Sequence, residues 1–195
     1  RQGHLAAVFR MYSYLKTRPN APLLFDPTSA PLAYDSFPHE PWSEFYGDVE
    51  EALPPNAPRP LGQPVALRCY LADDHAGDKV PSRSRSGILR DINSAPIVWF
   101  TKKQNTVETS SFGSEFVALK IATEMLRGLR YKLRMMGIHI AGPTYVYCDN
   151  NLVVINSSSP ASTLKKKSNS IAYHCVREAV AADEQQITYE NTKSN

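Results

Sequence analysis

The chain has 195 residues, of which 42% are hydrophobic and 21% charged, which is typical of one folded domain with an appendage and excludes a wholly disordered chain. Its net charge of +3 is uneven: residues 1–61 carry five Lys and Arg against seven Asp and Glu, and residues 62–195 carry seventeen against twelve. The basic part is compatible with a phosphate-rich partner.

The cysteines Cys69, Cys148 and Cys175 lie far apart and form no C-x-x-C pair. This pattern argues against a disulfide framework or a zinc site and favours a reducing, intracellular compartment. Because no run of about 18 apolar residues occurs, we expect no membrane span. The chain starts at Arg1 with no signal peptide behind it, so we expect it to be cut from a longer polypeptide.

The first predicted element is a helix over residues 4–16, where apolar side chains recur at helical spacing. Pro19 and Pro22 end it. Residues 22–64 are crowded with proline, which forbids regular ladders and predicts an extended connection segment. Two readings of this segment stay open: its aromatic residues dock on a neighbour, or it is a flexible tether. The predicted units are therefore 1–21, 22–64 and 65–195.

Three strands follow in close succession. Residues 65–72 alternate in the manner of a half-buried strand, and further strands are predicted near residues 87–91 and 96–101. Their short connections predict an antiparallel meander. We expect Trp99 and Phe100 to lie in the core.

A long helix is predicted next, from a cap at Ser110 or Ser111 to about Met136, with apolar residues at three- and four-residue spacing. A buried strand then ends at Asp149, followed by a short helix to about Ser157, a helix near residues 170–182 and a strand over 186–189. The order βββαβααβ indicates an α/β fold with a five-stranded mixed sheet of three antiparallel and two parallel strands.

Acidic residues fall at three places that this topology can bring together. Asp73 and Asp74 end the first strand, Glu115 lies in the first turns of the long helix, and Asp149 ends the fourth strand. Clustered carboxylates favour Mg²⁺ or Mn²⁺, and two such ions can activate water for phosphodiester cleavage. Each acid also has a plainer explanation, because Asp149 can cap the next helix and Glu115 can favour a helix start.

Several motifs resemble the ribonuclease H domain of copia-type LTR retrotransposon polyproteins. They are ADDHAGDK, the run from SRSRSGILRD to SSFGSEFVALK, VYCDNN and AYHCVREA, in this order, and RQGHLAAVFRMYSYLK resembles the end of the preceding reverse transcriptase. The resemblance implies a ribonuclease H-like fold, hydrolysis of the RNA strand of RNA–DNA hybrids during reverse transcription, and two divalent ions. Glu115 and Asp149 match family metal-ligand positions.

The chain departs from the family pattern at two places. The family's first strand reads Asp-Ala-Asp, and its first Asp is a ligand, whereas this chain reads Ala72-Asp73-Asp74. Asp73 can replace that ligand only if the strand slips, bulges or ends there. The family's fourth carboxylate comes just after a segment that resembles residues 190–195, and the sequence ends at Asn195. A decayed copy that only binds nucleic acid or supports the reverse transcriptase is therefore the rival hypothesis.

The resemblance also implies where the partners bind. We expect the hybrid to be held through backbone and 2′-hydroxyl contacts, and the reverse transcriptase of the same polyprotein to be a partner. The run Lys165, Lys166 and Lys167 is either a solvated surface or a phosphate contact. His75 and His174 are expected to pack or hydrogen-bond rather than to transfer protons. The expected location is the cytoplasm, in a virus-like particle, or the nucleus.

Overall fold

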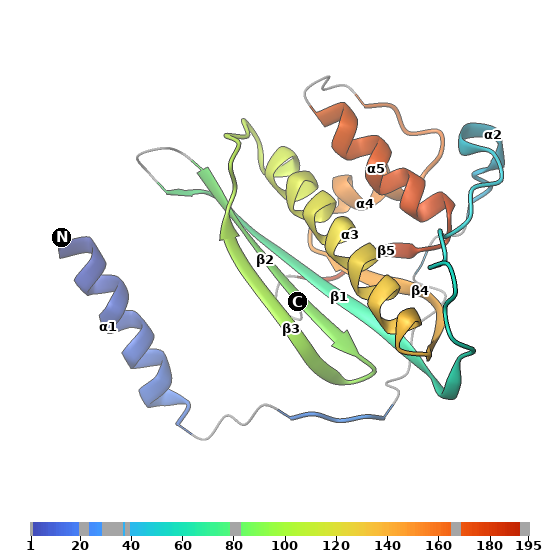
Figure 1. Ribbon diagram of the computed structural model, residues 1–195. Helices are drawn as coiled ribbons and strands as arrows, with labels where there is room; N and C mark the ends of the chain where they lie inside the picture. Colours follow the sequence, from blue (N-terminus) through green and yellow to red (C-terminus); the bar gives the residue numbers. More distant parts are fainter. Residues whose placement is uncertain are drawn as a thin grey trace.

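The computed structural model describes residues 2–19, 24–28, 37, 40–78, 83–164 and 169–191. Within these ranges the chain forms one mixed sheet with helices packed on it (Figure 1). The helices are α1 (Gln2–Thr17), α2 (Ser43–Tyr46), α3 (Ser111–Met135), α4 (Asn151–Ser158) and α5 (Ser170–Ala181). The strands are β1 (Leu61–Asp78), β2 (Arg83–Ile92), β3 (Ala95–Lys103), β4 (Ile138–Cys148) and β5 (Gln185–Tyr189).

The sheet has the strand order β3-β2-β1-β4-β5. The pairs β1–β2 and β2–β3 are antiparallel, whereas β1–β4 and β4–β5 are parallel. This arrangement confirms the predicted five-stranded mixed sheet, with the first and fourth strands as central neighbours. Because β1 and β4 are parallel, their carboxyl ends meet at one edge of the sheet.

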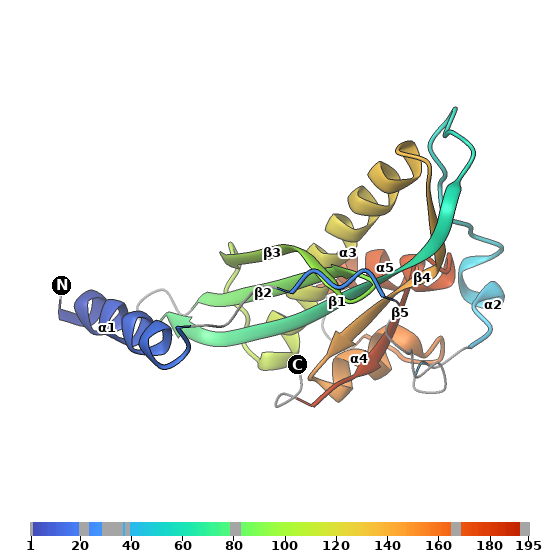
Figure 2. The same ribbon diagram turned by 90° about the horizontal axis from the view of Figure 1, so that it is seen from below.

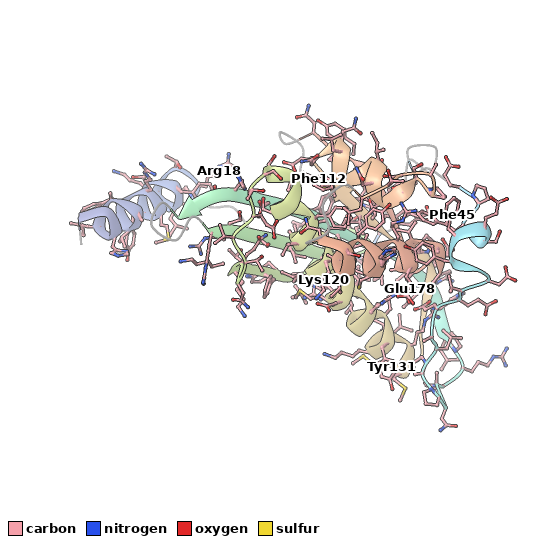
Figure 3. The ribbon with its side chains drawn as sticks, turned by 90° about the horizontal axis from the view of Figure 1, so that it is seen from above. Arg18, Phe45, Phe112, Lys120, Tyr131 and Glu178 are labelled. Carbon is pink, nitrogen blue, oxygen red and sulfur yellow. The ribbon has the colours of Figure 1, made fainter. Side chains whose placement is uncertain are left out.

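Helix α3 covers one face of this sheet because its sequence presents a continuous apolar stripe. Ser110 begins the helix, since its hydroxyl accepts a hydrogen bond from the Gly113 N–H at 3.3 Å. Phe116, Leu119 and Leu126 from the stripe pack with Leu71 of β1 in the main core. Figure 3 shows Phe112 at the start of α3, Lys120 and Tyr131 further along it, and Glu178 on the neighbouring α5. The predicted helix is therefore confirmed, with its start at the cap.

The opposite face of β1, β2 and β3 carries no helix among the described residues (Figure 2). Trp99 lies there with 64% of its surface exposed, so the prediction that it is a core residue is wrong. The reason is that β3 is an edge strand whose other face, with the partly buried Phe100, meets the core. Tyr70 of β1 stacks on Tyr147 of β4, with ring centroids 4.9 Å apart, and this pair fills part of the face.

Part of the proline-rich connection packs on the helical side of the domain. Trp42 is buried in the main core, and the guanidinium carbon of Arg177 in α5 lies 4.8 Å from the centre of the Trp42 ring. The same carbon lies 6.0 Å from the Tyr46 ring and 4.6 Å from the Tyr173 ring. Tyr46 is also joined to His174 Nδ1 at 2.9 Å. Of the two readings of this segment, docking therefore holds for residues 42–46.

A second contact fixes the connection to the far half of α3. The Glu51 carboxylate accepts hydrogen bonds from Arg130 at 2.8 and 2.7 Å, and it also pairs with Arg134. Arg130 is 3% exposed and donates to the Gly142 carbonyl oxygen as well. These two guanidinium groups lower the pKa of Glu51 to about 2, although partial burial alone would raise it.

Helix α1 lies apart from the sheet (Figure 1). Its apolar side chains are exposed, Phe9 and Tyr12 each by more than 60%. None of the helices in the described ranges is long and apolar enough to cross a membrane.

Candidate metal and nucleic-acid site

The register of β1 decides which residue of Ala72-Asp73-Asp74 faces the other acids. The pairing of β1 with β2 runs without a break from Leu67 to Asp74, and the register shifts only between Asp74 and Asp78. Ala72 lies opposite Gly87, and Tyr70 lies beside Tyr147 in the parallel register. The parallel pairing ends with Tyr70 and Tyr147, so Ala72 lies two residues beyond that pair on β1, and Asp149 lies two residues beyond it, just after the end of β4. The position where the family pattern has its first ligand is therefore occupied by a methyl group.

Asp73 lies on the other face of β1, the face that α3 covers. It is opposite Ser86, and its Oδ1 accepts a hydrogen bond from Gln104 Nε2 at 3.1 Å. Partial burial raises the pKa of Asp73, and a hydrogen bond from Ser114 acts in the opposite direction. The strand neither slips nor bulges at this residue, so Asp73 keeps its place on the face that α3 covers. The charge of Asp149 raises the pKa of Asp73, and the charge of Asp73 raises the pKa of Glu115, so Asp73 lies near both acids.

Asp74 returns to the face of Ala72, since side chains alternate along a strand. It is exposed and lies opposite Arg85 of β2. Asp74 lies two residues beyond Ala72 along β1, so it is further from the end of β4. Asp73 and Asp74 both remain predicted ligands: Asp73 lies on the face of the sheet that α3 and Glu115 occupy, and Asp74 lies on the face of Ala72.

Glu115 lies in the second turn of α3, next to the end of β4. The Cys148 thiol donates to its Oε2 over 3.9 Å. Burial raises the pKa of Glu115 to about 7, while a hydrogen bond from Asn150 lowers it and the charges of Asp149 and Asp73 raise it further. A half-buried carboxyl next to other carboxylates is the arrangement that a cation would stabilise in its charged form.

In the turn after β4, the residue that caps the next helix is a different residue from the one that lies beside Glu115. Asn150 caps α4, because its Oδ1 accepts from the N–H groups of Leu152 at 3.0 Å and Val153 at 3.3 Å. The alternative that Asp149 caps this helix is therefore wrong. Asp149 stands one residue before the cap, with its carboxylate close to Glu115.

Ligand atoms of Glu115, Cys148 and Asp149 lie within 4.8 Å of one another, and no other such group occurs in the described part of the chain. The two carboxylates are oxygen donors that suit Mg²⁺ or Mn²⁺. Burial raises the pKa of the Cys148 thiol to about 12, so it stays protonated and is a poor ligand for these hard cations. The donor set therefore fits a divalent ion with two protein ligands and lacks a third carboxylate at Ala72.

The remaining predicted site residues fall elsewhere. Lys165, Lys166 and Lys167 lie outside the described residues. His75 Nδ1 is 3.2 Å from Ser114 Oγ, and His174 bonds to Tyr46, so both histidines hydrogen-bond as predicted. Sequence reasoning gave no role to Gln104, whose buried amide connects three elements beneath the site. Its signal was its place in the motif run between SRSRSGILRD and SSFGSEFVALK, directly after a strand.

Comparison with known proteins places these features in context. No protein-family model matches the chain. Among solved structures, ribonuclease H1 of Halobacterium salinarum superposes with a TM-score of 0.51 at 13% identity, over 66% of this chain and 88% of that one. LC11-RNase H1 in complex with RNA/DNA hybrid gives 0.52 at 15% identity, over 66% and 88%. The fold is therefore ribonuclease H-like, as the motifs implied.

Curated relatives specify the kind of protein further. The Pol polyprotein from transposon RE1 of Arabidopsis thaliana is 28% identical over 131 residues, which is 67% of this chain and 9% of the polyprotein. That from transposon TNT 1-94 of Nicotiana tabacum is 26% identical over 134 residues, 69% of this chain and 10% of the polyprotein. The chain thus spans about a tenth of these relatives. Transposon Pol polyproteins as relatives and ribonucleases H as structural neighbours confirm the resemblance to a retrotransposon ribonuclease H domain.

Proposed function

We propose that the chain is the ribonuclease H domain of a copia-type LTR retrotransposon polyprotein and that it binds RNA–DNA hybrids. The ribonuclease H domains of this kind hydrolyse the RNA strand during reverse transcription, as endonucleases that use Mg²⁺ or Mn²⁺. The observation that supports reduced activity is that Ala72 stands where the family pattern has its first ligand, while the regular pairing of β1 puts Asp73 on the face that α3 covers. This chain therefore binds the hybrid and cleaves it weakly or not at all.

Glu115 and Asp149 are the residues that hold a divalent ion in this proposal. A bound cation supplies an activated water and offsets charge on the phosphodiester. Glu115, on a helix, and Asp149, after a buried strand, orient that ion from two rigid elements. Asn150 supports both, because it caps α4 and hydrogen-bonds to Glu115. A second ion requires the carboxylate that Ala72 lacks.

The ribonuclease H fold and the transposon relatives support hybrid binding, and a structural neighbour was solved in complex with RNA/DNA hybrid. Recognition through backbone and 2′-hydroxyl contacts predicts little dependence on base sequence. The reverse transcriptase of the same polyprotein is the proposed partner, and Lys165–Lys167 are proposed phosphate contacts. The cytoplasm, in a virus-like particle, or the nucleus is the proposed location.

Single-turnover cleavage of a labelled RNA–DNA hybrid in Mn²⁺ tests this proposal, with hybrid affinity measured in parallel by fluorescence anisotropy. Ala72→Asp should raise the cleavage rate at least about tenfold, since supporting groups of metal sites are already worth 10–100-fold. Asp149→Asn added to Ala72→Asp should abolish the gain. If no variant binds hybrid more tightly than duplex DNA, the proposed function is wrong.

A second candidate is an active enzyme in which Asp73 supplies the first ligand. The observation that favours it is electrostatic proximity, because the charge of Asp73 raises the pKa of Glu115. This candidate predicts that the unaltered chain cleaves the hybrid as fast as Ala72→Asp does. It also predicts that Asp73→Asn abolishes cleavage, whereas the first proposal predicts no such loss.

A further inference from the structure

The side chain of Gln104 connects the three elements that surround the candidate site. It directly follows β3 and is 2% exposed. Its Nε2 lies 3.1 Å from Asp73 Oδ1 in β1, 2.8 Å from Ser86 Oγ in β2 and 2.7 Å from the Ser114 carbonyl oxygen in α3. Its own backbone N–H donates to the Ser84 carbonyl oxygen at 2.8 Å, which fixes the residue to the start of β2.

These contacts hold the first turns of α3 against the end of the sheet. Ser114 directly precedes Glu115, so the bond to the Ser114 carbonyl oxygen restrains the backbone that carries the Glu115 carboxylate. The carbonyl oxygen has two lone pairs, and it can accept this bond in addition to its helical one. Ser114 is itself fully buried, and its hydroxyl donates to the Ser111 carbonyl oxygen at 3.0 Å.

Stability of the fold accounts for only part of what the Gln104 amide does. Gln104 Oε1 is buried and has no hydrogen-bond partner among the described residues. A buried acceptor without a donor costs about 1–3 kcal/mol, which offsets part of what the bonds of Nε2 to Asp73, Ser86 and Ser114 contribute to stability. What the amide adds is a directional link from the sheet to the residue before Glu115.

We propose that Gln104 is the positioning residue of the metal site. By holding the first turns of α3 it keeps Glu115 directed at Asp149, so that both carboxylates reach one cation. The proposal rests on the proposed function, because it assumes that Glu115 and Asp149 bind a divalent ion. Groups that orient metal ligands in this indirect way typically contribute 10–100-fold to metal affinity.

The test measures Mn²⁺ binding by electron paramagnetic resonance, in the full chain and in its Ala72→Asp variant. Gln104→Met keeps the volume of the side chain and removes its donors. We expect it to weaken Mn²⁺ affinity about tenfold or more and to speed amide exchange in the first turns of α3. The urea midpoint should also fall, because Asp73 Oδ1 loses its donor. Gln104→Glu, which keeps the shape but loses the amide donors, should weaken binding as well.

Thr123→Val is the matched control. Thr123 is a buried polar residue in the middle of α3 whose hydroxyl bonds to the side chain of Gln185, away from the site. It should lower stability and leave Mn²⁺ affinity unchanged. Equal Mn²⁺ affinity with and without Gln104→Met would overturn the positioning role alone. Loss of folding in both Gln104 variants would assign the residue to the fold and would also overturn the positioning role. Absence of Mn²⁺ binding in the starting proteins would instead refute the metal site itself.

Discussion

Asp73 Oδ1 accepts a hydrogen bond from Gln104 Nε2 at 3.1 Å, on the face of the sheet that α3 covers. This bond gives Asp73 a structural partner on the side away from Ala72. Asp73 therefore lies on the same face of the sheet as Glu115 of α3, whereas Asp74 returns to the face of Ala72.

Asp73→Asn should leave metal binding almost intact. Asparagine keeps the shape, and its Oδ1 can accept the same bond from Gln104. We expect Mn²⁺ affinity within about threefold of the parent, whereas Asp149→Asn should lower it at least about tenfold. Isothermal titration of both variants gives the comparison, and equal losses in the two would make Asp73 a ligand.

Glu115→Gln should stabilise the protein at neutral pH and have little effect in acid. Folding raises the pKa of Glu115 from 4.5 to about 7, so the folded state binds more protons than the unfolded state between these values. The free energy of unfolding of the parent protein therefore falls as pH rises through this window. That of the Glu115→Gln variant does not, because glutamine does not ionise. After discounting for partial exposure, we expect a gain of about 1–2 kcal/mol at pH 8. Urea unfolding at pH 4 and pH 8 measures it; a gain that is equal at both would contradict the shift.

Glu51→Gln should have the opposite pH dependence. The folded pKa of Glu51 is about 2 against 4.5, so its stabilisation is complete above pH 4.5 and is lost as pH falls toward 2. At pH 7 the substitution leaves the buried Arg130 without its carboxylate, and we expect a loss of roughly 2–3 kcal/mol. Glu44→Gln, on the exposed α2, is the control and should change nothing. The Glu51 account fails if the loss at pH 7 persists undiminished at pH 3.

Arg177→Lys should destabilise the chain although it keeps the charge. Arg177 is 3% exposed, lies against three aromatic rings and donates to backbone carbonyl oxygens, among them Ser159 at 2.8 Å and Pro160 at 2.7 Å. A lysine cannot reproduce this planar fork. We predict a loss of about 2–4 kcal/mol in urea unfolding, in keeping with the breaking of a buried polar network. Arg10→Lys on the exposed α1 should be neutral, and equal stability of all three proteins would refute the anchoring role.

Local patterns in the sequence predicted most of the fold because each element carries its own periodicity. The apolar stripe of α3 and the alternation in β1 both appear within a few residues. The end of β1 did not follow from its pattern, because Asp73 and Asp74 are polar but continue the backbone pairing with β2. The exposure of Trp99 depends on which face α3 covers, a property of the whole sheet.

The site was predicted in part for the same reason. Glu115 and Asp149 belong to distinct local motifs, and the topology brings them together. The bond between Arg130 and Glu51 spans 79 residues, and that between Gln104 and Asp73 spans 31, so neither leaves a local pattern. Register also lies beyond local reasoning, because one residue of slip exchanges Ala72 for Asp73.

The most direct test of the account is the Mn²⁺ affinity of three proteins: the unaltered chain, Ala72→Asp and Thr101→Asp. Thr101 is exposed in the same row of the sheet as Ala72, with Gly87 between them, so Thr101→Asp adds the same charge three strands away from β4 and Asp149. We predict at least about tenfold tighter binding for Ala72→Asp only. Equal affinities for Ala72→Asp and the unaltered chain would contradict the claim that Ala72 occupies the missing ligand position.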